Sequence, residues 1–435
     1  MIKIYNTLSK KVETFEPLHN GKVNMYVCGP TVYGDIHVGN ARPVIFFDFV
    51  KRYLSHLNYD VFYVSNITDI DDRIVEKAIE EKTSEDIIAN KYTEAFINIT
   101  KSIGSKLPDK MPKATHYISD MVRYIEKLLK DGYAYVKDSG VYFRISKVKD
   151  YGKLSGQILE NLEENIRIDN EDDKENSKDF ALWKKVDEGV EFESPFGKGR
   201  PGWHTECAVM NHEIFNGEID IHGGGADLIF PHHENEIAQT VAHSDHHLAK
   251  YWMHVARLNI ENVKMSKSLG NTVLVKDLIN ETNPNVFRLL ILGHQYRQPI
   301  NYTRDLLDQY EKQYQKLEST AKRVLLQIKD NYKKELDITI IKNVEDVLND
   351  DFNTPNLITI LQDLTKELNK ETDLEKLGVL YYTFTYILDM MGIDLNINLT
   401  HEILDTYEKW QVARSNKDFA SADVLRKKLI DQGWL

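Results

Sequence analysis

The chain has 435 residues and a formal net charge of −13, which argues against a protein coated with a nucleic-acid-binding surface but leaves room for a local basic track. Its length suits two or three domains, and its two cysteines, Cys28 and Cys207, are too few for a disulfide framework. No apolar stretch is long enough to span a membrane and no secretory signal is present, so we expect a cytoplasmic protein with no membrane partner.

The first elements of the chain predict a parallel sheet. Residues 22–28 (KVNMYVC) have the pattern of a buried strand, and residues 61–67 (VFYVSNI) have that of a second one. Between them, 41–57 carries apolar residues at the spacing of a helix face, namely Ile45, Phe46, Phe49, Tyr53, Leu54 and Leu57. Strand, helix and strand at this pitch make a βαβ unit, so function is expected at the carboxyl ends of its strands.

The helix of this unit has its own start signal. Asn40 can cap it, and Pro43 falls in the first turn, where a missing N–H group costs nothing. Residues 36–40 are therefore expected at a strand end and a helix N-terminus. Such a place offers unpaired backbone N–H groups and the positive end of a helix dipole to an anion.

The middle of the chain is less regular. From about 105 to 200 the pattern loosens into an inserted segment, within which the acidic stretch 160–179 is interpreted as a solvated surface loop. The sequence then predicts a strand at 217–222, a helix from Pro231 to about His243, another strand at 251–257 and a loop at 264–270.

After about residue 300 the pattern becomes helical. Apolar residues alternate at spacings of three and four, which suits a helix packed in a bundle: Leu307, Tyr310, Tyr314, Leu317, Ala321, Val324 and Ile328. The stretch 349–355 (NDDFNTP) punctuates this helical region with turn and capping residues. A last helical stretch, 405–432, carries the basic residues Lys409, Arg414, Lys417, Arg426, Lys427 and Lys428.

Two motifs far apart in the sequence carry the first chemical signal. In "KMSKS", 264–268, two lysines three residues apart could stabilise charge that develops on a polyphosphate, although by composition alone this is an ordinary exposed basic loop. Residues 37–40 read HVGN, at the opening of the predicted parallel sheet. The combination resembles the HIGH and KMSKS motifs of the class I aminoacyl-tRNA synthetases. Asn40 stands where the family has the final His, and it can still cap a helix or donate to a phosphate or ribose oxygen.

Further stretches resemble one family within that class, the cysteinyl-tRNA synthetases. They are "MYVCGPTVYG" at 25–34, "NITDIDD" at 66–72, "RPGWHTEC" at 200–207 and "DIHGGGADLIFPHHENEIAQ" at 220–239. "PKATHYI", "YGKLSG" and "KDFALW" in the insert and "DDFNTP" in the helical region extend the match over nearly the whole chain. We found no reason in the insert to expect an editing domain.

The residues also indicate a metal site. His232 and Glu236 are four apart on a predicted helix, so their side chains point the same way, although such a pair is more often a surface hydrogen bond. Cys28 ends one predicted strand and Cys207 precedes another, so a cleft between the half-sheets could bring all four together. This set suits Zn²⁺, and the number of ligands alone suggests a closed structural site. The resemblance implies instead one zinc ion per chain that accepts the substrate's thiolate as a further ligand.

The resemblance assigns roles to further residues. It implies a catalytic role for His37, Asn40, Lys264 and Lys267, and ATP binding by His37, Gly39, Asn40 and Lys267, with Mg²⁺ accompanying ATP. It implies substrate binding by Gly29, Thr68, Trp203 and Asp227. The structural alternatives are a core position for Trp203 and a loop cap for Asp227.

The resemblance also implies the domain plan and the partners. We expect an α/β, Rossmann-like parallel-sheet catalytic domain at 1–300 with the connective insert at about 105–200, an all-α helical bundle that binds tRNA at 301–398, and a small anticodon-binding module at 399–435 that is shorter than is common in the family. The substrates would be L-cysteine, ATP and tRNA(Cys), handled by a monomer. Trp410 and Trp434 could stack on bases or belong to the core.

Two other functions compete with this interpretation. An enzyme that joins activated cysteine to an amino sugar would share the zinc and nucleotide residues but would lack an anticodon module, which 413–433 resembles. A zinc-dependent cysteine sensor or tRNA-binding relic would not need the phosphate-binding residues His37, Lys264 and Lys267.

Overall fold

The structure is a computed structural model. It describes residues 1–157, 173–244, 246–261, 263–264, 272–329 and 331–435, and of residues 263 and 264 it describes the backbone alone. The chain forms two compact units, and each is described by itself. The first comprises Lys3–Leu278 with Met1 and Tyr296–Asn301, and the second comprises Ile279–Gln295 and Tyr302–Leu435 with Ile2. No helix among the described residues is long and apolar enough to cross a membrane.

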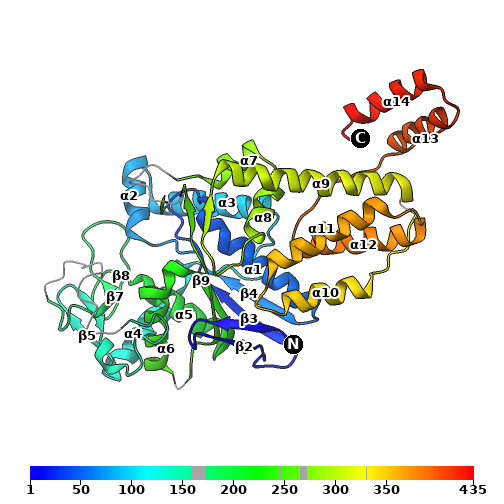
Figure 1. The fold of residues 1–435 in the computed structure, drawn as a ribbon. Coiled ribbons are helices and arrows are strands. Elements are labelled where there is room, and N and C mark those ends of the chain that lie inside the picture. The colour runs from blue at the N-terminus through cyan, green and yellow to red at the C-terminus, as the bar shows by residue number, and fades with distance from the viewer. Residues whose placement is uncertain (158–172, 245, 262, 265–271, 330) are drawn as a thin grey trace. The chain divides into compact units, whose positions relative to one another are not determined.

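A four-stranded sheet forms the centre of the first unit (Figure 1). Its order is β10-β9-β3-β4, with every pair parallel. The strands are β3 (Lys22–Val27), β4 (Asp60–Ser65), β9 (Ile219–Gly225) and β10 (Ala249–Val255). The carboxyl-terminal halves of β3 and β4 are continuously buried, as expected of parallel strands covered on both faces. The predicted parallel α/β sheet is therefore confirmed.

Helix α1 (Val38–His56) connects β3 to β4 and packs on the sheet. Five of the six residues of its predicted apolar face are fully buried: Ile45, Phe46, Phe49, Tyr53 and Leu54. Phe47 packs against the backbone of β9, where a side chain on Gly223 would begin 2.2 Å from the Phe47 ring. Glycine at this position therefore lets the helix approach the sheet closely.

Helices α5 (Trp203–Phe215) and α6 (Glu234–His243) flank the later strands. The other α-helices and strands described before residue 303 outside the insert are β1 (Lys3–Asn6), β2 (Lys11–Thr14), α2 (Asp72–Glu81), α3 (Glu85–Ser102), β11 (Leu258–Ile260), β12 (Val263–Lys264), α7 (Val275–Glu281), α8 (Pro284–Leu292) and β13 (Ile300–Tyr302).

The insert is more ordered than the sequence suggested. It contains α4 (Ile118–Lys130) and an antiparallel sheet of β5 (Ala134–Lys137), β6 (Gly140–Phe143), β7 (Phe180–Lys184) and β8 (Arg200–Pro201). The strands were missed because β6 and β7 are buried almost throughout, so neither shows the alternation of a half-exposed strand. Their apolar side chains join α4 in one core around Trp183, Phe143 and Leu128.

Of the acidic stretch 160–179, the structure describes only 173–179, because 158–172 lies outside the described residues. Asp179, at its end, is 4% exposed. Its carboxylate accepts hydrogen bonds from the Tyr135 hydroxyl at 2.8 Å and from the Ile145 N–H at 3.1 Å. The predicted solvated surface loop is therefore wrong at this residue, which supports the insert's core instead.

The insert is fastened to the start of α6 by a buried carboxylate. Glu234 accepts hydrogen bonds from the backbone N–H of Gly152 at 2.9 Å and of Ser155 at 2.8 Å, and from the Ser155 hydroxyl at 2.8 Å. Glu234 is only 1% exposed. The "YGKLSG" stretch thus forms a loop whose backbone is held by this helix.

The second unit is helical, as predicted. Its helices beyond α8 are α9 (Arg304–Ile328), α10 (Ile338–Leu348), α11 (Thr354–Lys370), α12 (Leu374–Met390), α13 (His401–Ser415) and α14 (Phe419–Asp431). All seven residues of the predicted apolar stripe on α9 are buried, and α9 packs against α8, α11 and α12. Within "NDDFNTP", Asn353 caps α11, as its turn and capping chemistry suggested.

Candidate active site and metal centre

The carboxyl ends of the four parallel strands surround a pocket of about 410 Å³. Its lining comes from the segment after β3, the start of α1, the start of α5, and the segments after β9 and β10. Open α/β sheets place ligand sites at this edge. Of the predicted site residues, the lining includes Cys28, Gly29, His37, Gly39, Asn40, Trp203 and Asp227.

The structure brings the four predicted metal ligands together. The sulfurs of Cys28 and Cys207 lie 3.6 Å apart, Cys28 Sγ lies 3.3 Å from Glu236 Oε1, and His232 Nε2 lies 3.0 Å from the same oxygen. One ligand atom from each residue lies within 4.8 Å of every other. Cys207, His232 and Glu236 are each at most 1% exposed, whereas Cys28 is half-buried.

Local structure explains this convergence. Cys28 directly follows β3, and Cys207 lies on α5, a helix that the sequence analysis did not predict. His232 belongs to a kinked turn, Ile229–His233, in which the Phe230 backbone is not helical, and this turn runs into α6, where Glu236 lies in the first turn.

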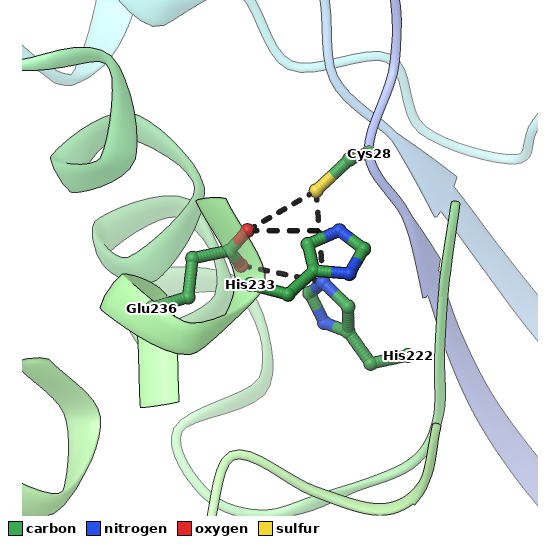
Figure 2. Close-up of side chains that lie close together, drawn as sticks. All are labelled: Cys28, His222, His233 and Glu236. Atoms are coloured by element: carbon green, nitrogen blue, oxygen red, sulfur yellow. Dashed lines mark hydrogen bonds and ion pairs between the residues drawn. The ribbon is translucent and has the colours of Figure 1, made fainter. Parts of the chain in front are cut away.

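Two further histidines approach the same carboxylate, and sequence reasoning missed both. Figure 2 shows Cys28, His222, His233 and Glu236 pointing toward one another. His222 Nε2 lies 3.6 Å from Cys28 Sγ and 3.3 Å from Glu236 Oε2, and His233 Nε2 lies 3.9 Å from Glu236 Oε1. The only sequence signal was their place in "DIHGGG" and "PHHENE".

The position of His222 follows from strand register. It pairs with Tyr26 on β3 and with Trp252 on β10, so the three side chains form one row across the sheet. The His222 ring stacks at 5.3 Å from the Tyr26 ring and lies 4.4 Å from the Trp252 ring. Through His222, this aromatic row reaches the polar cluster.

Burial dominates the pKa values of the cluster. It raises the pKa of Glu236 and, together with the hydrogen bond to Cys207, that of Cys28, and it lowers the pKa of His222 and His233. Burial also acts to raise the pKa of Cys207, but its hydrogen bonds with Cys28 and His232 outweigh this and lower it to about 7. The imidazoles of His222 and His233 are therefore neutral.

This donor set fits a divalent metal ion. Among the described residues, the buried atoms Glu236 Oε2 and His233 Nε2 have no hydrogen-bond partner. Buried polar atoms are ordinarily satisfied, so an unsatisfied carboxylate oxygen beside two sulfurs and an imidazole is the arrangement expected of a cation site.

At the other end of the pocket, His37 and not Asn40 caps α1. His37 Nδ1 accepts hydrogen bonds from the backbone N–H of Gly39 at 3.1 Å and of Asn40 at 3.2 Å. The Asn40 side chain accepts in return from the His37 N–H at 3.4 Å, which completes a capping box. The predicted Asn40 cap is therefore wrong, because an imidazole nitrogen takes the usual role of a Ser or Asp oxygen. Pro43 correspondingly lies inside the helix and not in its first turn.

This cap also corrects the expected source of anion binding. The N–H of Val38 donates to the Val273 carbonyl at 3.0 Å, and those of Gly39 and Asn40 are taken by His37. The helix start therefore offers its dipole but not the unpaired N–H groups that were expected. Because Nδ1 of His37 accepts, the neutral ring carries its proton on Nε2 and is a donor there.

The structure reaches the KMSKS motif only at its edges. Lys264 ends β12, and 265–271, with Lys267, lies outside the described residues. Beyond the motif the chain returns to α1, because Val273 accepts from Val38, and Val275 donates to the Ile36 carbonyl at 3.0 Å. Residues 36–38, at the start of HVGN, therefore lie beside residues 273–275, which follow KMSKS.

Arg42 ties α1 to the chain on both sides of this region. Its guanidinium is 1% exposed and donates to the carbonyls of Ala256 at 2.6 Å, Arg257 at 3.1 Å and Gln298 at 2.7 Å. These carbonyls lie in the segment after β10 and ahead of β13. Arg42 therefore fixes the helix that carries His37 against the strand that leads toward KMSKS.

Arg42→Met is expected to lower the melting temperature of the first unit by about 5 °C, because three buried carbonyls lose a charged donor worth about 1 kcal/mol or more each. Thermal unfolding followed by circular dichroism measures this shift. Arg42→Lys should recover only part of it, since an ammonium cannot spread over three acceptors as a guanidinium does. A melting temperature unchanged in Arg42→Met would show that these hydrogen bonds add nothing to stability.

The predicted substrate residues lie around the cluster. The Trp203 ring lies 4.2 Å from that of His232, Asp227 is exposed, and Gly29 follows Cys28. Thr68 is buried three residues beyond β4, and its hydroxyl donates to Glu206 Oε2 at 3.0 Å and accepts from Asn66 Nδ2 at 3.2 Å. Neither Asn66 nor Glu206 was singled out from the sequence.

In the C-terminal stretch, the two tryptophans have different surroundings. Trp434 is 7% exposed and belongs to the core of its unit, which was one of the two alternatives. Trp410 is half-buried, with the Arg414 guanidinium 4.8 Å from its ring centre. Lys409 and Lys428 pair with Asp405 and Glu402, whereas Arg426 and Lys427 are exposed.

Comparison with known proteins agrees with this geometry. Residues 14–312 match the family model for the class I (C) tRNA synthetase catalytic domain, and 343–396 match the DALR domain. A solved methionyl-tRNA synthetase from Mycobacterium tuberculosis has a TM-score of 0.61 at 14% identity, covering 92% of this chain and 96% of that one. A putative arginyl-tRNA synthetase from Campylobacter jejuni has a TM-score of 0.60 at 13% identity, covering 89% and 95%. The fold is thus that of the class I aminoacyl-tRNA synthetases.

Sequence similarity narrows the class to a family. The chain is 52% identical to the cysteine--tRNA ligase of Acholeplasma laidlawii and 47% identical to that of Onion yellows phytoplasma, in both cases over 100% of each chain. The chain belongs to the cysteine--tRNA ligase family, whose members are aminoacyl-tRNA synthetases.

Proposed function

We propose that the chain joins L-cysteine to tRNA(Cys) at the expense of ATP, with Zn²⁺ held by Cys28, Cys207, His232 and Glu236. One observation carries the proposal: the ligand atoms of these residues lie within 4.8 Å of one another beside a pocket whose lining also includes His37 at the start of α1. A thiol-binding end and a phosphate-binding end within one pocket suit the activation of cysteine.

The zinc proposal rests on the chemistry of the donors. Two sulfurs, an imidazole and a carboxylate are ligands that Zn²⁺ prefers. When bound, the ion would supply a Lewis acid that favours a thiolate over a hydroxyl and so would distinguish cysteine from serine. A pocket that measures only shape separates such near-isosteres by about a hundredfold. A separate editing site would then be unnecessary.

The surrounding residues would hold the rest of the amino acid. Gly29, Trp203 and Asp227 line the pocket near the cluster, where Asp227 could accept from the substrate's ammonium group. Thr68 has one donor and two acceptor positions, of which Glu206 and Asn66 take one each. One lone pair of its hydroxyl therefore remains for an N–H group of the substrate.

In the first step, the carboxylate of cysteine attacks the α-phosphorus of ATP, the bond from that phosphorus to the bridging oxygen breaks, and pyrophosphate leaves. Positioning and charge stabilisation carry such a step. His37 would donate from Nε2 to a phosphate oxygen, with Gly39 allowing close approach and Asn40 beside it. Lys264 and Lys267 would neutralise the polyphosphate, which Mg²⁺ accompanies as part of the nucleotide substrate.

In the second step, a hydroxyl of the terminal adenosine of tRNA, the 2′-hydroxyl by analogy with the class, attacks the carbonyl carbon of the adenylate, and AMP leaves. The helical second unit would bind the tRNA, with the anticodon approached by α13 and α14. The exposed Arg426 and Lys427 support this part of the proposal, since phosphate contacts come from basic side chains. We propose a cytoplasmic monomer, with the catalytic domain at 1–300 and the two tRNA-binding parts at 301–398 and 399–435.

Isotope exchange between pyrophosphate and ATP tests the proposal. Exchange should depend on cysteine and proceed without tRNA, and charging of tRNA(Cys) should follow when that tRNA is added. If folded, zinc-loaded protein supports no exchange, the function that remains is that of a cysteine sensor. Exchange without charging of any tRNA would favour a ligase that transfers cysteine to an amino sugar.

A further inference from the structure

A chain of buried hydrogen bonds connects the segments that carry the two cysteines. The Gly29 N–H donates to Asn66 Oδ1 at 2.8 Å, Asn66 Nδ2 donates to Thr68 Oγ1 at 3.2 Å, and that hydroxyl donates to Glu206 Oε2 at 3.0 Å. Asn66, Thr68 and Glu206 are each 1% exposed. Gly29 directly follows Cys28, and Glu206 directly precedes Cys207, so each end of the chain of bonds is one residue from a sulfur.

We propose that Asn66, Thr68 and Glu206 act as a clamp that sets the separation of Cys28 and Cys207 and thereby tunes the affinity of the metal centre. These three are positioning residues: they act through the backbone next to each cysteine. The proposal rests on the proposed binding of zinc by those cysteines.

Two of the segments that the clamp joins lie in close contact. A Cβ atom on Gly29 would lie 1.8 Å from the Asn66 carbonyl oxygen, so the two backbones are in contact. Backbone hydrogen bonds from Thr68 to the Pro30 carbonyl at 3.1 Å, and from Val32 to the Thr68 carbonyl at 3.2 Å, hold the same two segments together. In the described part of the chain, Thr68 is linked to α5 by one side-chain hydrogen bond, which it donates to Glu206.

The geometry of the two sulfurs gives the clamp its role. Two ligand atoms can bind one ion well only while their separation is held, and these sulfurs lie 3.6 Å apart. A fixed distance between the segment after β3 and α5 holds the sulfurs at this separation. Among the described residues, Glu206 has no ion pair with a basic side chain, so its buried carboxylate serves Thr68 as an acceptor and not as half of a salt bridge.

Zinc affinity measured by competition with a chromophoric chelator, in the absence of amino acid, tests the clamp without involving substrate binding. Thr68→Val keeps the shape of the side chain but removes the hydroxyl, and it should weaken zinc binding by about 10- to 100-fold, as loss of groups that orient ligands commonly does. Glu206→Met should do the same. Glu206→Gln keeps an acceptor oxygen, so its affinity for zinc should lie within about threefold of that of the unchanged protein.

Thr93→Val is the matched control, because Thr93 is a buried hydroxyl on α3 that donates to the Ala89 carbonyl at 2.6 Å, away from the cluster. It should leave zinc affinity unchanged. Cobalt(II) substituted for zinc gives a second measure, since its visible absorption bands should shift in Thr68→Val and not in Thr93→Val. The double variant with Thr68→Val and Glu206→Met should be no weaker than either single variant, because one chain of bonds is cut in each case.

Affinity and cobalt spectrum unchanged in both Thr68→Val and Glu206→Met would overturn the clamp, and so would fully additive losses in the double variant. Failure of the proposed function has a different signature: the unchanged protein would bind no zinc, or Cys207→Ser would bind it as tightly. Circular dichroism confirms that each variant is folded, and if Glu206→Met is not, Thr68→Val with its control decides the question.

Discussion

Cys207→Ser is expected to release most of the bound zinc and to lower the preference for cysteine over serine by at least about a hundredfold. The substitution replaces a thiol whose pKa is lowered to about 7 by a hydroxyl that stays protonated and is a poor ligand. Cys28, His232 and Glu236 would remain as three ligands. Elemental analysis and pyrophosphate exchange with each amino acid measure the two effects.

Met210→Leu is the matched control, since Met210 is buried on the same helix and offers no ligand that the proposal uses. A volume-conserving change of this kind leaves the core intact and should leave zinc content at one ion per chain. If Cys207→Ser also keeps its full zinc content, the assignment of the metal site is wrong, and with it the argument that a metal ion selects the amino acid.

His37→Ser is expected to slow pyrophosphate exchange by about 10²- to 10³-fold while leaving stability nearly unchanged. Serine is a good helix cap, so it can replace His37 Nδ1 as acceptor for the N–H groups of Gly39 and Asn40. It cannot supply the Nε2 donor at the pocket wall. His37→Ala should lose both functions and cost about 1 kcal/mol of stability in addition.

The rate of exchange and the melting temperature, measured on the same preparations, separate the two roles of His37. Asn283→Ser replaces the capping residue of α8 and is the control for changing a helix cap. It should not slow pyrophosphate exchange. Should His37→Ser exchange at the full rate, the imidazole would be a helix cap and nothing more.

The sequence was most informative where pattern and chemistry coincide locally. The parallel sheet was predicted from two apolar runs with one predicted helix between them. Five of the six apolar positions predicted on that helix, α1, are fully buried. The spacing of His232 and Glu236 predicted side chains on one face, and their atoms lie 3.0 Å apart. The roles of the metal and nucleotide residues came from the family resemblance and remain proposals.

The features that the sequence missed depend on contacts between distant segments. His222 enters the cluster through the register of three strands, and register cannot be read from one strand alone. Asn66 and Glu206 look like ordinary polar residues until the fold joins them through Thr68. The cap of α1 was misassigned because Asn is a common capping residue and His is a rare one, so local propensity favoured the wrong neighbour.

The hydrogen bonds of Glu234 have a consequence for any attempt to build a smaller version of this protein. Deleting the insert would remove Gly152 and Ser155, which together donate three hydrogen bonds to Glu234, and would leave a buried carboxyl group without these donors two residues from Glu236. A minimal catalyst would therefore have to keep the "YGKLSG" loop or redesign Glu234 as an apolar residue. The insert, which the sequence suggests could be removed, thus supports the helix that carries the proposed metal ligand Glu236.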